Sequence, residues 1–172
     1  IVLTLALTLT MLAGCGGTTT ASSSSAGEAV SSSGSGNDSA ASGGNVIKIG
    51  VFEPSTGDSG AGGKQEMLGM QYANQETPTV EIGGTTYDIQ LVYADNGSDS
   101  AKAPTAAAEL VSQNVSLVLG SYGSGVSIAG GPIFGEAGLA AIGVTCTNPG
   151  VTAGNDYYFR ICFLDPFQGT VL

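Results

Sequence analysis

Two apolar segments of the chain end in small and hydroxylic residues, a pattern that could bind an anion. They are LVLGSYGSGVS at residues 117–127 and AIGVTCTNP at residues 141–149. A short apolar run bounded by turn residues is typical of a buried strand in a parallel sheet, and open α/β sheets bind ligands at the carboxyl edge of their strands. The N–H groups of the helix predicted after the first segment favour an anion, Ser124 offers a hydroxyl, and Gly123 and Gly125 allow a ligand close to the backbone. These residues therefore form a candidate carboxylate site, unless Ser124 only caps the helix.

No intact catalytic motif accompanies this candidate site. GDSGAGGKQ resembles a phosphate-binding loop, but Asp58 and Gln65 depart from the required pattern, and GVSIA approaches the nucleophile elbow but ends in Ala129. The sequence shown contains no His, which excludes a Ser-His-Asp triad and a His metal site. Cys146 and Cys162 are poor zinc ligands without a CxxC pair. We therefore predict a binding protein that is not an enzyme and that uses no metal and no cofactor.

Strand and helix patterns alternate along the part of the chain that carries this site. The predicted strands cover residues 46–52, 80–82, 85–94, 116–120, 139–144 and 157–163, with Gly83-Gly84 as a hairpin turn. The predicted helices cover residues 64–74, 100–114 and 125–137, and a further helix begins at Asp165. Such alternation predicts an α/β fold with a parallel, doubly wound sheet and helices on both faces, and residues 46–172 have the size of one domain.

The first 45 residues lack this pattern and predict a membrane-anchored tether. Residues 1–15 begin with an apolar stretch too short to span a membrane, followed by LAGC, which resembles a bacterial lipobox. In such a signal peptide Cys15 becomes the lipidated N-terminus, and the lipid would hold the protein at a membrane surface. Residues 16–45 are rich in Ser, Gly, Ala and Thr and cannot bury enough apolar surface to fold, so they predict a disordered linker.

The charge and the two other cysteines restrict the partners of the protein and its redox state. With 14 acidic and 4 basic residues the net charge is −10, which argues against binding of nucleic acid by bulk attraction. Outside the cytosol Cys146 and Cys162 could form a disulfide if their Cα atoms lie close enough, or they could be two buried free thiols. The sequence alone favours neither state.

Several motifs, in order along the chain, resemble one protein family. After the lipobox and the tether these are IKIGVFEPSTGDSGAGGKQEMLGMQYAN, YDIQLVYADNGSD, LVLGSYGSG, AAIGVTCTNPGVT and FRICFLDPFQG. They are similar to the extracellular ligand-binding lipoproteins of branched-chain amino-acid-type ABC importers. The resemblance implies a type I periplasmic-binding-protein fold, in which two α/β lobes close on a ligand. It also implies that residues 46–172 are an incomplete first lobe and that the second lobe lies outside the sequence shown.

The resemblance also implies roles for individual residues. Ser124, with the backbone beside it at Gly125, corresponds to the site of a ligand's α-carboxylate. The Thr145 carbonyl and the Thr147 hydroxyl correspond to the α-ammonium site, and the Thr147 N–H also faces the carboxylate. Asp165 corresponds to an acid that is often close to the ammonium group. Each has a structural alternative, because Thr145 and Thr147 could be turn residues and Asp165, before a proline, could cap a helix.

Two positions depart from the pattern of the family. Gly62 stands where members often have an aromatic residue against the ligand side chain, so we expect an enlarged or open pocket and a ligand bulkier or more polar than leucine. Gly123 stands where some members have the second Cys of a disulfide, so that disulfide has no counterpart in this chain.

Together these inferences predict the substrate-binding component of an ABC importer. We expect it to capture an amino acid, branched-chain or related, and to deliver it to an ABC permease as a monomer. The anchor at Cys15 would place it on the extracellular face of the bacterial cytoplasmic membrane, which is periplasmic if the cell has an outer membrane. The alternative is a ligand-sensing domain of the same fold coupled to a signalling partner, but a sensor usually carries transmembrane helices, whereas a lipobox suits an importer.

Overall fold

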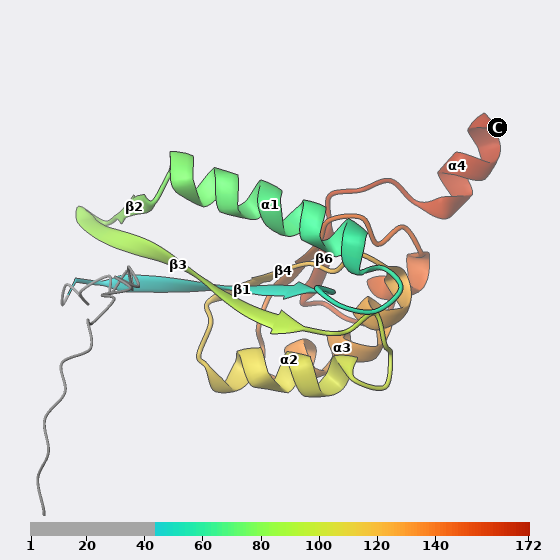
Figure 1. Cartoon of the computed structure of the whole chain (residues 1–172), viewed down its shortest axis with the longest axis horizontal. Helices are drawn as coiled ribbons and strands as arrows, with labels where there is room; N and C mark the ends of the chain where they lie inside the picture. Colours follow the sequence, from blue (N-terminus) through green and yellow to red (C-terminus); the bar gives the residue numbers. More distant parts are fainter. Residues whose placement is uncertain (1–43) are drawn as a thin grey trace, which may run out of the picture. The chain divides into compact units, whose positions relative to one another are not determined.

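A mostly parallel sheet of six strands forms the centre of the structure (Figure 1). The computed structural model describes residues 44–172, so the predicted signal peptide with Cys15, and all but the end of the predicted linker, lie outside the described residues. The strands are β1 (Val46–Glu53), β2 (Thr79–Ile82), β3 (Thr85–Asp95), β4 (Leu117–Leu119), β5 (Ala141–Gly143) and β6 (Tyr158–Arg160). They lie in the order β2-β3-β1-β4-β5-β6, and every neighbouring pair is parallel except β2 and β3, which form the predicted hairpin.

Helices cover both faces of this sheet, as the alternating pattern predicts. The covering helices are α1 (Gly60–Glu76), α2 (Ala103–Ser112) and α3 (Ser124–Glu136). The chain also forms the 3₁₀ helix η1 (Pro149–Val151) and α4 (Asp165–Val171), and no residue of α4 is buried. α1 lies over one face, and α2 and α3 pack together on the other (Figure 1). Among the described residues, no helix combines the length and the apolar character that crossing a membrane requires. The predicted class, a parallel, doubly wound α/β sheet, is confirmed.

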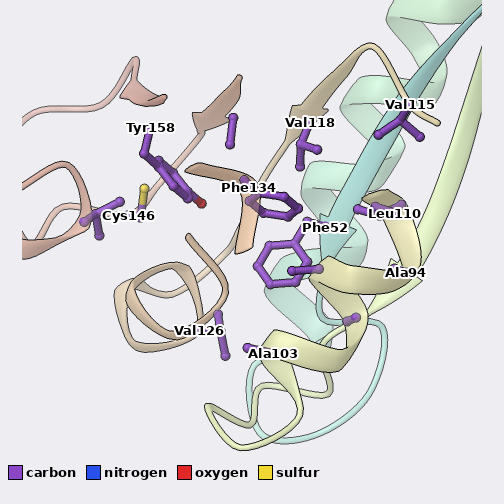
Figure 2. Packing of buried hydrophobic residues seen from close by; sticks show 14 of the residues in the cluster. Phe52, Ala94, Ala103, Leu110, Val115, Val118, Val126, Phe134, Cys146 and Tyr158 are labelled. Atoms are coloured by element: carbon purple, nitrogen blue, oxygen red, sulfur yellow. The ribbon is translucent and has the colours of Figure 1, made fainter. Parts of the chain in front are cut away.

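The hydrophobic core fills the space between the sheet and the α2–α3 pair (Figure 2). Phe52 of β1 and Phe134 of α3 are fully buried, and their rings meet edge to face with centroids 5.3 Å apart, which is a favourable aromatic geometry. Gly130 lets α3 come this close, because a Cβ atom there would lie 2.7 Å from the Phe52 ring. Leu110 and Val118 complete the buried centre. The core therefore fixes α3 against the carboxyl end of β1.

The predicted elements all occur, but their bounds shift where contacts distant in sequence decide them. The strands predicted at residues 139–144 and 157–163 shrink to three residues each in β5 and β6. β5 ends at Gly143 because the chain folds back there, so that the Cys146 sulfur occupies the space of a side chain at position 143. α1 begins at Gly60, earlier than the predicted residue 64, and η1 was not predicted.

β1 lies where the strand order reverses, and open α/β sheets have their ligand crevice at such a reversal. From β1 the chain crosses through α1 to β3 on one side, and then through α2 to β4 on the other side of β1. α1 follows β1 over one face of the sheet, whereas α3 follows β4 over the opposite face (Figure 1). The first turns of the two helices therefore diverge above the carboxyl ends of β1 and β4. Open α/β sheets bind their ligands in such a crevice.

Candidate ligand-binding site

Ser124 begins α3 at this crevice and holds the neighbouring loop. The N-cap of α3 is Gly123, with a φ of 104°, so the alternative that Ser124 only caps the helix is wrong. Ser124 Oγ accepts a hydrogen bond of 3.1 Å from the Asn148 N–H. Because an accepting hydroxyl keeps its own proton, Ser124 can still donate to a carboxylate. The N–H groups of the first turn have no acceptor within the helix, and Gly125 in that turn is exposed, so this end of α3 is suited to an anion.

Thr147 and Asp165 are joined to each other beside this contact. The Asp165 N–H donates to the Thr147 carbonyl oxygen at 3.1 Å. Asn148, which follows Thr147, is the residue that donates to Ser124. The structure thus brings three of the sequence-predicted site residues into one connected set of contacts: Ser124, Thr147 and Asp165. Asp165 lies in the first turn of α4, whose N-cap is Leu164, so the helix-cap alternative for Asp165 is also wrong.

Thr145 lies on the same loop but faces α1. Its side chain is exposed, and its hydroxyl donates to Glu66 Oε1 at 2.5 Å. The role predicted for Thr145 uses its carbonyl oxygen, which this hydrogen bond leaves free to accept. The contact ties the end of β5 to the second turn of α1, on the opposite side of the crevice from α3.

Arg160 braces the loop that carries Thr147. Its guanidinium donates hydrogen bonds of 2.7–3.3 Å to several oxygens of that loop, namely the carbonyls of Cys146, Asn148 and Pro149 and the hydroxyl of Thr152. A planar guanidinium holds several acceptors in a fixed arrangement, so the loop backbone is set before any ligand arrives.

Cys146 and Cys162 are free thiols. Cys146 is fully buried and Cys162 is half-buried. Burial, with a smaller contribution from the nearby Cys162, raises the pKa of the Cys146 thiol to about 11. Of the two states that the sequence left open, the structure has the free thiols.

Tyr122 fills the space beside Gly62. A Cβ atom at residue 62 would lie 2.5–2.8 Å from three atoms of the Tyr122 ring, closer than side-chain carbons approach one another. An aromatic ring from the β4–α3 loop thus occupies the space beside Gly62, and the expectation that Gly62 enlarges or opens the ligand pocket stays a prediction. Tyr122 is 39% exposed, so part of its ring remains open to solvent. Sequence reasoning did not select Tyr122, because nothing in its local sequence relates it to α1.

Two carboxyl groups below Tyr122 were also missed. Glu53, the last residue of β1, is 1% exposed, and its Oε2 accepts a hydrogen bond of 2.7 Å from the Tyr122 N–H. Glu66 is half-buried and binds Thr145 through Oε1. The other oxygens, Glu53 Oε1 and Glu66 Oε2, are buried without a hydrogen-bond partner. Burial is the main reason that the Glu53 pKa is raised to about 9, and the hydrogen bond and charge of Glu66 add to it, so Glu53 is protonated at neutral pH. The sequence feature that could have indicated a buried acid is the position of Glu53 at the end of the apolar run VIKIGVFE.

Asp95, at the end of β3, shapes the loop between β1 and α1. Its Oδ1 accepts from the N–H groups of Ser55, Thr56 and Gly97, and its Oδ2 accepts from the Thr56 hydroxyl at 2.6 Å. Partial burial opposes the charge of Asp95, but these hydrogen bonds outweigh it and hold its pKa well below the usual range. This acid is therefore occupied by the loop. Within residues 44–172, no group of three or more His, Cys, Asp or Glu side chains could hold a metal ion.

Comparison with known proteins assigns this chain to a family. The family described as periplasmic binding protein matches residues 46–170. The Leu/Ile/Val-binding protein homolog 2 of Brucella abortus is 35% identical over 126 residues, and an amino acid binding protein of Pseudomonas aeruginosa is 34% identical over 128. Each match covers 73% of this chain and 34% of the relative, so the chain spans about a third of the length of these relatives.

Solved structures agree with the sequence relatives. A leucine binding protein from Thermotoga maritima shares 37% identity with a TM-score of 0.68, covering 73% of this chain and 35% of that one. A branched-chain amino acid transporter substrate binding protein from Streptococcus pneumoniae, in complex with isoleucine, shares 33% identity with a TM-score of 0.62, covering 70% of this chain and 35% of that one. The chain belongs to the periplasmic binding protein family.

Proposed function

We propose that the full-length protein is the extracellular substrate-binding component of an ABC importer and that it captures an amino acid, branched-chain or related, for an ABC permease. The observation that carries this proposal is the connected set of contacts at the crevice, in which Ser124, Thr147 and Asp165 meet beside the start of α3. An amino acid needs hydrogen-bond donors for its carboxylate and acceptors for its ammonium group within a few ångströms of each other. This edge of the sheet offers both.

The ligand carboxylate binds at the start of α3. The Ser124 hydroxyl and the free N–H groups of the first helical turn, beside the exposed Gly125, are donors there. The Thr147 N–H is a further donor from the facing loop. Hydrogen bonds between such donors and an ionised carboxylate are about twice as strong as neutral ones.

The ligand ammonium group binds on the opposite side of Ser124. Its acceptors are the Thr145 carbonyl oxygen and the Thr147 hydroxyl, and the exposed Asp165 adds a negative charge near them. The contact between the Asp165 N–H and the Thr147 carbonyl holds this acid at the edge of the site. The ligand side chain then lies toward Tyr122, whose ring provides an apolar wall above Gly62.

The relatives support the amino-acid ligand and the importer. They are described as binding Leu, Ile and Val or amino acids, and one of the solved relatives holds isoleucine. Closure of a second lobe over the site would exclude water and strengthen each hydrogen bond. The lipid anchor at Cys15, the linker at residues 16–45 and the monomeric state belong to the same proposal.

Binding by the full-length protein tests this proposal. A thermal-shift screen of the amino acids identifies the ligand, because a ligand that binds only the native state raises the melting temperature. Ser124→Ala and Thr147→Ala should then each weaken binding about 10- to 150-fold, since a hydrogen bond to a charged group contributes roughly 1.5–3 kcal/mol. Asp165→Asn should weaken binding of the amino acid more than binding of its 2-hydroxy analogue, which has no ammonium group.

Ser112→Ala is the matched control. Ser112 is exposed at the far end of α2, and its hydroxyl bonds only within its own helix, to the Glu109 carbonyl at 2.7 Å. This variant should bind as tightly as the parent. If Ser124→Ala and Thr147→Ala also bind as tightly as the parent, the ligand occupies another part of the protein and the proposal is wrong.

A further inference from the structure

The two halves of the proposed site are connected through a pair of acids, the buried Glu53 and the half-buried Glu66. The Tyr122 N–H, two residues before Ser124, donates to Glu53. The Thr145 hydroxyl, two residues before Thr147, donates to Glu66. Each acid therefore holds one of the two loops that carry ligand-binding groups, and the two acids come from elements, β1 and α1, that contribute neither loop.

The unpartnered oxygens of this pair need a proton. Glu53 Oε1 and Glu66 Oε2 are both buried and lack a partner. Ionised carboxylates only accept hydrogen bonds, so two of them cannot bond to each other and repel at short range. The side chains of Glu53 and Glu66 lie within hydrogen-bond reach of each other, so one proton between them turns the repulsion into a hydrogen bond. The paired aspartates of aspartic proteases share one proton in this way.

We propose that Glu53 and Glu66 share one proton and that this carboxyl–carboxylate bridge is a positioning device, holding the β4–α3 loop and the β5–β6 loop at the spacing a ligand requires. Both acids are positioning residues, since neither is assigned a contact with the ligand. The expected effect on ligand binding rests on the proposed function. The expected effect on stability does not depend on any ligand.

Other charged groups near Glu53 do not replace the proton. The groups that shift its pKa are Glu66 and the Tyr122 N–H, and neither is a cation. Tyr158 is the first residue of β6, and its hydroxyl donates to the Gly120 carbonyl at 3.0 Å. The charge of Glu53 is one of the smaller causes that raise the pKa of Tyr158. Arg160 acts on Tyr158 and is not among the groups that act on Glu53.

The space around Glu53 Oε1 is closed. A side chain at Gly120 would collide with this oxygen and with the Phe52 carbonyl, so the loop backbone covers the acid directly. When the shared proton leaves for solvent at alkaline pH, two negative charges face each other at short range and repel. The strain is then relieved by displacement of the loops that the two acids hold.

The sign of the pH effect follows from the raised pKa. The native pair keeps its shared proton up to a pH of about 9, whereas Glu53 in the unfolded chain loses a proton near 4.5. The native state therefore binds more protons throughout this interval, and the stability it gains from this proton falls as the pH rises. The stability gained from this proton is fully present below the pKa of Glu53 in the unfolded chain, and it is lost once the pH passes the pKa of Glu53 in the native state.

The test compares Glu53→Gln with the parent in the full-length protein. Gln keeps an acceptor for the Tyr122 N–H and offers a permanent N–H donor to Glu66, so it reproduces the protonated pair. The melting temperature without ligand, measured from pH 6 to pH 10, should decline less steeply in Glu53→Gln than in the parent. Glu76→Gln removes an exposed acid from the end of α1, the helix that carries Glu66, and its melting temperature should decline with pH like that of the parent.

Binding of the amino acid found by the thermal-shift screen gives the second readout. Because the ligand ammonium group also titrates at alkaline pH, the ratio of parent to variant affinity at each pH is compared. At pH 7 the affinity of Glu53→Gln should lie within about threefold of the parent's. As the pH rises, the affinity of Glu53→Gln should increase relative to that of the parent. Glu66→Ala, which leaves the Thr145 hydroxyl and Glu53 Oε1 without a partner, should lose about tenfold in affinity at pH 7.

Equal pH profiles of the melting temperature in the parent and Glu53→Gln would overturn the shared proton. A growing advantage in stability without any change in relative affinity would overturn the positioning role. If no amino acid binds the parent, the proposed function fails, while the ligand-free pH profile still decides whether the pair shares a proton.

Discussion

The contact between Gly62 and Tyr122 leads to a prediction about two adjacent glycines. Gly62→Ala places a methyl group 2.5 Å from the Tyr122 ring, and Gly63→Ala places one against the Pro54 carbonyl oxygen and ring. Contacts this short must be relieved by movement. The Tyr122 ring is the end of a flexible side chain and is 39% exposed, so it can rotate away. Gly63 is buried against backbone, which cannot move without distorting the loop.

The two substitutions should therefore differ in stability although both replace Gly by Ala in one helix. Ala is favoured over Gly in a helix by up to about 1 kcal/mol, so Gly62→Ala should lie within about 1 kcal/mol of the parent. Gly63→Ala gains the same propensity but forces overpacking that costs about 1–3 kcal/mol or more, so it should be the less stable variant. Denaturant unfolding of the full-length proteins measures both, and equal stabilities would refute the distinction between a movable ring and a fixed backbone.

Ligand preference provides the second part of this prediction. Displacement of the Tyr122 ring by Gly62→Ala should change relative affinities for amino acids of different side-chain size, whereas Ser112→Ala should not. Tyr122→Ala removes the wall, and adding Gly62→Phe to it supplies an aromatic ring from α1 instead. Because the two rings compete for one space, the effects of Gly62→Phe and Tyr122→Ala on affinity should be strongly non-additive. Additive effects would show that the ring over Gly62 does not contact the ligand.

Three further predictions concern residues away from this contact. Cys15→Ser in the full-length protein should release it from the membrane fraction, and a variant that still sediments with membranes and carries no less labelled lipid would contradict the anchor. Cys146 should resist a thiol reagent at pH 8 in the native state, because burial keeps its thiol protonated, and Cys162 should react first. Equal reaction rates of the two cysteines in the native protein would contradict this order. Asp95→Asn should lower the melting temperature at pH 7. The difference in melting temperature from the parent should narrow as the pH falls below 3.8, the usual pKa of Asp, because the stability gained from a lowered pKa is lost when the group is protonated. A difference that stays constant down to pH 2 would contradict this prediction.

The sequence predicted the elements well because their signals are local. The alternation of apolar runs with helical patterns, the Gly83-Gly84 turn and the start of a helix at Asp165 all correspond to elements of the structure. The lengths of β5 and β6 were overestimated because apolar residues continue beyond them. Where the pairing stops depends on how the chain folds back at Gly143, and no periodicity encodes that contact.

The candidate site was predictable only where it follows from strand ends. Ser124 and Thr147 stand directly after apolar runs that parallel pairing places side by side, so their proximity could be inferred from the order of the segments. Gly62 was interpreted from its own position, and the outcome depends on a ring sixty residues away in sequence. Glu53 was passed over because an acid at the end of a strand is usually solvated, whereas this one is covered by a loop from β4.

Tyr122 shows why these missed residues belong to one arrangement. Its backbone N–H is held by Glu53 from β1, and its ring is seated on Gly62 from α1. Two earlier elements thus fix both the main chain and the side chain of a single residue that stands two positions before Ser124. A small residue at 62 gives the ring its place, and a protonated acid at 53 gives the backbone its acceptor. A change at either position should therefore reach the start of α3 through Tyr122, even though neither side chain is assigned a contact with the ligand's carboxylate.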